Sequence, residues 1–452
     1  MRILLLNHFP LEGSGSGVYT ANTAKSLARK GHDVCVIMPE NISDYKRYEG
    51  VELHPVFFKA GAPAGASESG CASACADEVK SAGGGLGASI DTPLPFNYPC
   101  FTTHPRSVVN FFELSDEEIE MYMAAFTAAV EEEIARFKPD IIHVQHIWLL
   151  AAIAVQFDLP VIITAHGTDL IGHGKSERFH RYTNLAAEKC RKIISISEDS
   201  DKLVHEYFPQ ADGKVQLMRN GYDEQVFYKG EYEREKVLAE LGIGGPAAGS
   251  DGAAGRGASE TEKAAGRSGE RGAPRFDKLV CFAGKMTQIK GIDTLLRAAA
   301  IYGDERTATV LAGNGELFAE MNALRDELGL QDRVFFVGNL AHEPLRALYN
   351  VADVSVVPSR YEAFGLVAVE AMACGKYVVA SRVGGLPDII GGHEGLGKIF
   401  EVDAVEELAA AVDEVLDGTV KYDGDAIARF AFENYAQSMV IERLIEVYGE
   451  IV

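Results

Sequence analysis

The fold is decided by one stretch of this 452-residue chain, Pro358-Ser-Arg-Tyr-Glu-Ala-Phe-Gly-Leu-Val-Ala-Val-Glu-Ala-Met-Ala-Cys-Gly375. It follows an apolar run at 353–358, which is typical of a buried parallel strand. It ends at Gly375, placed where a glycine commonly terminates a helix. Every residue from Ala363 to Cys374 is apolar or glycine except Glu370, which predicts a short helix buried on all sides.

The same stretch carries two carboxylates and a set of backbone donors. Glu362 precedes the expected helix, and Glu370 lies about two turns further along. A buried carboxylate is costly unless it is paired, so we expect both to have partners. The N–H groups of Phe364, Gly365 and Leu366 fall at the helix start, where donors are unsatisfied and the helix dipole is positive. The two carboxylates can accept hydrogen bonds and the amides between them can donate, a combination that suits the hydroxyls of a sugar and a ribose.

The full string P-S-x-Y-E-x-F-G-L-x-x-x-E-A-M-A-x-G resembles the signature of retaining glycosyltransferases of the GT-B fold, glycosyltransferase family four. A structural salt bridge on a buried helix is the alternative interpretation. The resemblance extends over nearly the whole chain and is looser in its first half. It implies an α/β protein of two Rossmann-like, doubly wound domains facing across a cleft, the first binding mainly the acceptor and the second the nucleotide sugar.

Length and composition agree with such a protein. The chain is long enough for two large domains, and its net charge of −23 disfavours nucleic acid as a partner. No apolar run approaches the ~18 residues that span a bilayer. Seven cysteines, an odd number, favour reduced thiols and a cytoplasmic protein. The basic run at 175–192 keeps peripheral contact with the inner membrane face open as an alternative to a solvated helix face.

Domain boundaries follow from motifs and composition. The family resemblance implies an acceptor-side domain at 1–222, a nucleotide-sugar domain at 223–426, and a terminal helical segment at 427–452 that crosses back to the first domain. Residues 60–92 and 244–275 are rich in Gly, Ala and Ser, and they predict flexible insertions.

The chain opens with the pattern of a doubly wound sheet. A strand at 2–9, a glycine-rich loop at 10–17, a helix at 18–30 and a strand at 34–38 form this unit. The loop does not complete G-x-G-x-x-G, because Thr20 occupies the third glycine position. The family resemblance implies that Gly15 and Gly17 contact the donor phosphate or the acceptor, and a purely structural turn is the alternative.

Another candidate follows a buried strand at 159–164. The segment 165–169 lies at the carboxyl end of that strand, where α/β sheets bind ligands, and it resembles the family's T-x-H-G-x-D. This implies that His166 is catalytic and lies beside the transferred sugar, whereas a core histidine is the alternative. His143 and His146 share no strand face, so we expect no metal there.

The second domain begins with a strand at 278–282, a turn at 283–291 and a helix at 292–299. Lys285 and Lys290 flank a glycine turn at a helix start, which is suited to a diphosphate. The family pattern is G-R-x-x-x-x-K-G, so Lys285 replaces an arginine and loses its bidentate fork.

The resemblance implies a sugar transfer with retention at the anomeric carbon, by front-face attack. His166, Lys290 and Glu362 would be catalytic, and Glu370 would hold the ribose. We expect no metal and no cofactor, the nucleotide sugar being a co-substrate, and a glycan, lipid-linked or small-molecule acceptor. The alternatives are a GT-B-fold sugar-nucleotide epimerase, a non-catalytic nucleotide-sugar-binding subunit, and a nicotinamide oxidoreductase, which the broken glycine pattern disfavours.

Overall fold

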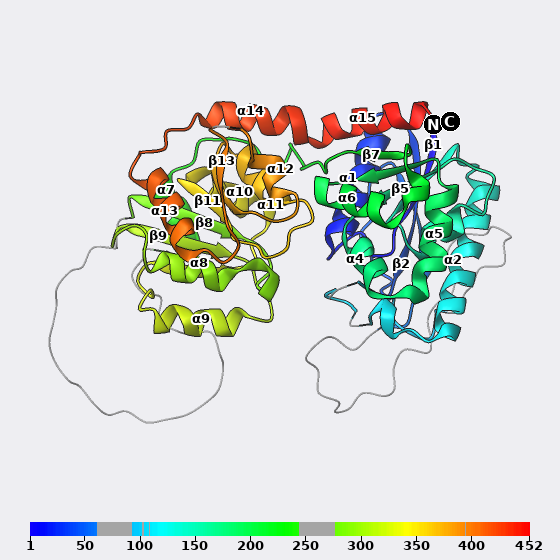
Figure 1. The fold of residues 1–452 in the computed structure, drawn as a ribbon, viewed down its shortest axis with the longest axis horizontal. Helices are drawn as coiled ribbons and strands as arrows, with labels where there is room; N and C mark the ends of the chain where they lie inside the picture. The colour runs from blue at the N-terminus through cyan, green and yellow to red at the C-terminus, as the bar shows by residue number, and fades with distance from the viewer. Residues whose placement is uncertain (61–92, 102–103, 108, 244–275, 394) are drawn as a thin grey trace, which may run out of the picture. The chain divides into compact units, whose positions relative to one another are not determined.

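A computed structural model describes residues 1–60, 93–101, 104–107, 109–243, 276–393 and 395–452 (Figure 1). They form two compact units: unit 1 comprises Met1–Gly221 with Gln437–Val452, and unit 2 comprises Tyr222–Ala436. The terminal segment is therefore shared, with residues 427–436 in unit 2 and 437–452 in unit 1. Apart from Ala60, the stretches at 60–92 and 244–275 lie outside the described residues.

Unit 1 is built on a seven-stranded parallel sheet in the order β3-β2-β1-β4-β5-β6-β7. The strands are β1 (Arg2–Leu6), β2 (Asp33–Glu40), β3 (Val51–Phe57), β4 (Ile141–Gln145), β5 (Val161–Ala165), β6 (Lys192–Ser195) and β7 (Val215–Leu217). The chain moves outward from β1 in both directions, so the strand order reverses between β1 and β4. Such a switch point places ligands outside the carboxyl ends of the strands.

Helices cover both faces of this sheet. They are α1 (Gly15–Arg29), α2 (Asp116–Arg136), α3 (Leu149–Ala154), α4 (Thr168–Lys175), α5 (His180–Lys189), α6 (Glu198–Tyr207) and α15 (Gln437–Gly449), with 3₁₀ turns η1 (Phe111–Glu113), η2 (Glu177–Phe179) and η3 (Pro209–Ala211). Alternate strand residues point to opposite faces. Leu4 and Leu6 join a core with α2 and α3, whereas Ile3 and Leu5 join a core with α1 and α15.

Unit 2 contains a six-stranded parallel sheet in the order β10-β9-β8-β11-β12-β13. The strands are β8 (Lys278–Ala283), β9 (Thr307–Ala312), β10 (Val334–Gly338), β11 (Val354–Val357), β12 (Tyr377–Ser381) and β13 (Gly397–Phe400). The helices are α7 (Arg234–Glu240), α8 (Ile292–Ala299), α9 (Phe318–Glu327), α10 (His342–Val351), α11 (Leu366–Ala373), α12 (Leu386–Ile390), α13 (Val405–Leu416) and α14 (Gly424–Tyr435), with the 3₁₀ turn η4 (Gln288–Lys290). The order reverses between β8 and β11, which places a second switch point at their carboxyl ends.

The largest differences from the expected elements are in the first strand, the first helix and the terminal segment. The first strand ends at Leu6 and not at residue 9. Helix α1 begins three residues early, because the Ser14 side chain accepts the N–H of Gly17 and caps the helix at that point. The terminal segment is two helices and not one, because Ala436 adopts an extended conformation between α14 and α15.

Candidate functional site in the second unit

Two loops at the carboxyl edge of the unit 2 sheet are held against each other by backbone contacts and by one arginine side chain. Gly291 has a φ of +62°, and a Cβ at that position would overlap the carbonyl oxygen of Pro358. From the facing loop, the Arg360 N–H donates to Ile289 O at 2.8 Å, and the Arg360 guanidinium donates to Gln288 O at 2.8 Å. The turn after β8 and the loop after β11 are thereby fixed side by side.

This docking brings together two residues 72 positions apart, Lys290 and Glu362. The Lys290 ammonium donates to Glu362 Oε2 at 2.6 Å, and the two side chains are 21% and 15% exposed. The Ser359 hydroxyl lies 3.5 Å from the same carboxylate oxygen. The predicted phosphate lysine and the predicted sugar carboxylate are therefore an ion pair with each other. The pair is reachable from solvent, so a ligand can compete for either partner.

The start of α11 presents backbone donors beside this pair. Gly365 caps the helix with a φ of +110°, a conformation that favours glycine. Within the described part of the chain, the N–H groups of Phe364, Gly365 and Leu366 donate no hydrogen bond. Unsatisfied amides at a helix N-terminus are a ready site for oxygen ligands.

Glu370 is on the same helix and differs from expectation. Its side chain is half-buried, and no described residue supplies it with a hydrogen bond or an ion pair. Burial raises the pKa of its carboxyl to about 8. The expectation of a paired carboxylate is therefore wrong, because the group responds to burial by retaining its proton. Nearby, the hydroxyl of the buried Tyr349 is also without a partner among the described residues.

A turn after β12 supports Glu362 from behind. Gly384 has a φ of +51°, and a Cβ there would overlap the carbonyl oxygen of Glu362. The Gly385 N–H donates to the same oxygen at 3.3 Å. No local sequence pattern indicates that this turn fixes the backbone of Glu362, because the contact depends on how two loops dock.

Lys285 lies on the same turn as Lys290, with an exposed side chain. Its neighbour Met286 donates its N–H to Asn314 O at 2.9 Å, which fastens this turn to the loop after β9. Gly313 allows the two loops to approach, because a Cβ there would overlap the carbonyl oxygen of Gly284.

In unit 1, His166 follows β5 and is almost fully buried. Its Nε2 lies 2.8 Å from the side-chain oxygen of Gln145, so Nε2 carries the ring proton and donates it. Burial lowers the pKa of His166 to about 3, which keeps the ring neutral at physiological pH. Asp169 accepts the N–H groups of His166 and Ile147 at 3.1 and 2.8 Å and fixes the backbone. No local pattern indicates a role for Gln145, because its partner is 21 residues away, just beyond the end of the neighbouring strand.

The two glycines at the start of α1 are not equivalent. A Cβ on Gly17 would overlap the carbonyl oxygen of Pro10, whereas a Cβ on Gly15 would meet nothing within 4 Å. Packing therefore requires glycine at position 17, and the space at position 15 remains open.

The described residues contain no cluster of three or more His, Cys, Asp or Glu side chains placed to hold a metal ion. His143 bonds to Tyr448 and Thr164 at 2.6 and 2.8 Å. None of the described helices is both long and apolar enough to cross a bilayer.

Comparison with known proteins supports one family. Residues 268–437 match the family model described as glycosyl transferases group 1, and residues 91–226 match glycosyltransferase family 4. An uncharacterized glycosyltransferase of Methanocaldococcus jannaschii is 28% identical over 447 residues, 96% of this chain and 94% of its own length. The D-inositol 3-phosphate glycosyltransferase of Mycolicibacterium smegmatis is 28% identical over 348 residues, 72% of this chain and 71% of its own length.

A solved structure of the Anabaena protein HepE in complex with UDP-glucose superposes with a TM-score of 0.65, at 17% identity and with complete coverage of both chains. The two parallel α/β units are consistent with that likeness. The chain belongs to the family four, group 1 glycosyltransferases and has their two-domain, Rossmann-like GT-B fold.

Proposed function

We propose that this glycosyltransferase moves a hexose from a nucleotide-sugar donor to a hydroxyl acceptor with retention at the anomeric carbon. The observation that carries the proposal is the Lys290–Glu362 pair, 2.6 Å apart, beside the unsatisfied amides that open α11. It supplies a cation, an acceptor and neutral donors within one loop cluster. A sugar diphosphate requires this combination, because its phosphates are anionic and its hydroxyls both donate and accept.

A UDP-hexose is the first donor to test. The relative whose structure contains UDP-glucose shares the fold with this chain, and its identity of 17% leaves the base and sugar to experiment. Glu370, 8 positions beyond Glu362 on α11, is the proposed ligand of the ribose hydroxyls. The amides of Phe364, Gly365 and Leu366, together with Glu362, are proposed to hold the hexose.

In the proposed reaction, the bond from the anomeric carbon to the diphosphate oxygen breaks, and a bond to the acceptor oxygen forms on the same face. The acceptor proton passes to the leaving phosphate oxygen, so charge and atoms balance. Negative charge grows on the diphosphate as the bond breaks, and cations placed at that charge lower the barrier. Lys290 is assigned this role, with Lys285 as a second cation. Competition by the diphosphate would release Glu362 from Lys290 and free its carboxylate for a sugar hydroxyl.

His166 is proposed as the unit 1 group that contacts the reacting sugar or the acceptor. Its proton lies on Nε2, so Nδ1 is available to accept a hydrogen bond. The neutral ring would orient a hydroxyl and would not contribute a full positive charge. Gly15 and Gly17 are proposed to let the α1 N-terminus approach an anionic substrate group.

The acceptor is proposed to be a glycan, a lipid-linked sugar or a small polyol. Because one relative is named a D-inositol 3-phosphate glycosyltransferase, inositol phosphate is a reasonable first small-molecule acceptor. A cytoplasmic location, with the alternative of peripheral contact at the inner membrane face, is part of the same proposal.

A thermal-shift screen against UDP-, GDP- and ADP-sugars tests the donor assignment. A ligand present at 100 times its Kd adds about 2.7 kcal/mol to stability, which is easily measured. We expect one nucleotide series to raise the melting temperature of the wild type and not that of Glu370→Ala. No shift with any nucleotide sugar would contradict the proposal. Product analysis then separates transfer from epimerisation, in which the donor changes without an acceptor.

A further inference from the structure

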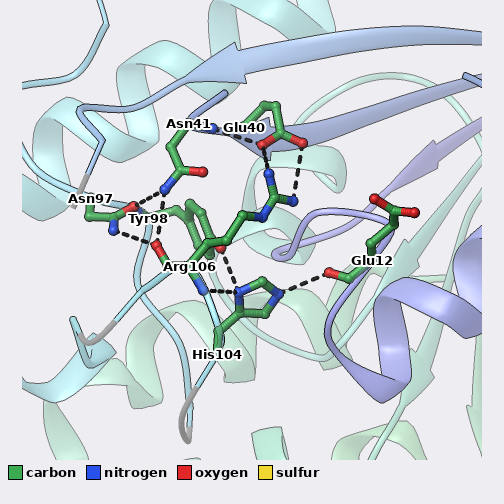
Figure 2. Close-up of polar contacts among 7 residues, drawn as sticks. All are labelled: Glu12, Glu40, Asn41, Asn97, Tyr98, His104 and Arg106. Atoms are coloured by element: carbon green, nitrogen blue, oxygen red, sulfur yellow. Dashed lines mark hydrogen bonds and ion pairs between the residues drawn. The ribbon is translucent and has the colours of Figure 1, made fainter. Parts of the chain in front are cut away.

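A polar network in unit 1 ties the glycine-rich loop before α1 to the end of strand β2 (Figure 2). Because α1 begins at Gly15, the glycine-rich loop that was predicted at 10–17 is in the structure the segment of residues 10–14. Its contact with the network is a backbone contact: the carbonyl oxygen of Glu12 lies 2.9 Å from Nε2 of His104. His104 is 92 residues away in sequence, and its side chain is almost fully buried.

The imidazole of His104 lies directly against the loop backbone. Gly13 has a φ of +84°, and a Cβ at that position would come within 2.8 Å of His104 Nε2. The loop therefore combines a left-handed glycine with a hydrogen bond to the preceding carbonyl. It continues into Ser14, whose side chain caps α1 by accepting the N–H of Gly17.

The network assigns the proton of His104. Nδ1 accepts the backbone N–H of Arg106 at 3.1 Å, so it carries no proton. The Tyr98 hydroxyl lies 2.6 Å from the same nitrogen, and burial raises the pKa of Tyr98, so the phenol keeps its proton and donates it. With two donors on Nδ1, the ring proton is on Nε2 and is donated to the Glu12 carbonyl.

The remaining contacts fix this ring to the sheet. The Arg106 guanidinium forms an ion pair with the buried Glu40 at the end of β2. The Arg106 carbonyl oxygen accepts the amides of Asn41 and Asn97 at 3.0 and 2.8 Å. Figure 2 shows these side chains converging on Arg106 and His104. The end of β2 is thus connected to the loop backbone through the imidazole of His104.

We propose that His104 is a positioning residue, whose Nε2–H holds the glycine-rich loop and the α1 N-terminus in place for donor turnover. This inference rests on the proposed role of Gly15 and Gly17 in substrate contact. No local pattern indicates this role for His104, because the Glu12 carbonyl that it contacts is 92 residues away in the sequence.

The two ring nitrogens can be tested separately. In His104→Asn, the short amide can place an oxygen where Nδ1 was and accept from Tyr98 and Arg106, but it does not reach Glu12. In His104→Gln, the longer amide can place an N–H where Nε2 was and donate to Glu12, while the acceptor at Nδ1 is lost. His104→Ala removes both contacts.

Two measurements follow on the full chain: hydrogen–deuterium exchange of the peptide covering residues 11–19, and turnover of UDP-glucose to UDP and glucose without acceptor. We expect His104→Ala and His104→Asn to exchange faster in this peptide and to lose turnover by roughly tenfold to a hundredfold, mainly in kcat. His104→Gln should stay within about threefold of the wild type in turnover and show wild-type exchange.

A merely structural role predicts the opposite order, with Asn better than Gln because Asn keeps the network at Nδ1. The proposal would be overturned if Asn were better tolerated than Gln, or if His104→Ala left the exchange of the peptide unchanged. It would also be overturned if exchange became faster without a loss of turnover. If the wild type does not turn over UDP-glucose, the donor assignment fails, and the exchange of residues 11–19 still decides whether His104 holds the loop.

Discussion

Replacing Glu370 by glutamine should remove a pH dependence from nucleotide binding. Burial raises the pKa of this carboxyl to about 8, so it is largely protonated at pH 7 in the free protein. Ribose hydroxyls that donate to the carboxylate would favour its charged form. Binding should therefore release a proton, and affinity for UDP should increase as pH rises through 8. Affinity would instead decrease with rising pH only if the ligand favoured the protonated acid.

The size of the effect follows from the ionised fraction. With a pKa of about 8, roughly one tenth of the carboxyl is ionised at pH 7 and roughly nine tenths at pH 9. If the ionised form binds and the neutral form does not, the Kd for UDP should fall about tenfold across this interval. Glu370→Gln mimics the neutral acid, so its Kd should equal or exceed the pH 7 value of the wild type and change little with pH.

Calorimetric titration of UDP at pH 7, 8 and 9, in buffers of different ionisation enthalpy, measures both the Kd and the protons released. Tyr349→Phe is the matched control, because it removes the neighbouring buried hydroxyl and leaves the carboxyl in place. The control should keep the pH dependence. A wild-type Kd that is constant from pH 7 to 9, or a Gln variant that retains the wild-type slope, would refute the ribose assignment.

Three other outcomes are expected. Lys290→Ala should lower kcat on the order of 10²–10³-fold with a smaller change in KM, whereas Lys285→Arg should be tolerated. Steady-state kinetics with a donor that the wild type turns over measures both variants. A rise in KM alone for Lys290→Ala would contradict the assigned role. Donor turnover should survive EDTA, and complete loss restored by Mg²⁺ would make the phosphate assignment wrong or incomplete. Gly17→Ala should lower the melting temperature and Gly15→Ala should not, because only a Cβ at position 17 overlaps the carbonyl oxygen of Pro10. Equal melting temperatures of the two variants in scanning calorimetry would count against this packing.

Local patterns predicted the framework of the chain well. Strand β11 was predicted from an apolar run, because strands buried in a parallel sheet are apolar throughout. Helix α11 was predicted from an apolar segment interrupted only by Glu370, but it is not buried on all sides as expected, because Leu366, Val367 and Glu370 are half-buried. The string from Pro358 to Gly375 contains enough specific residues to indicate the family without any knowledge of contacts. Helix α1 begins at Gly15 and not at the expected residue 18, because the side chain of Ser14 caps the helix at that point.

What the sequence could not predict is how loops dock. The pairing of Lys290 with Glu362 depends on a close approach between Gly291 and Pro358, which no local pattern encodes. Glu370 was wrongly expected to have a partner, because a buried carboxyl can avoid its desolvation cost either by pairing or by protonation. Only the surroundings decide between these outcomes.

We propose above all that the chain cleaves a nucleotide sugar with retention at the anomeric carbon. The most direct test is to follow UDP-α-glucose, labelled with ¹³C at the anomeric carbon, by NMR during the first minutes of incubation with the protein. Retention predicts that the first product signal has the α configuration, with UDP released in equal amount, before free glucose can equilibrate. Early appearance of the β product would contradict retention. If neither UDP-glucose nor any other nucleotide sugar were consumed, the donor assignment itself would be contradicted.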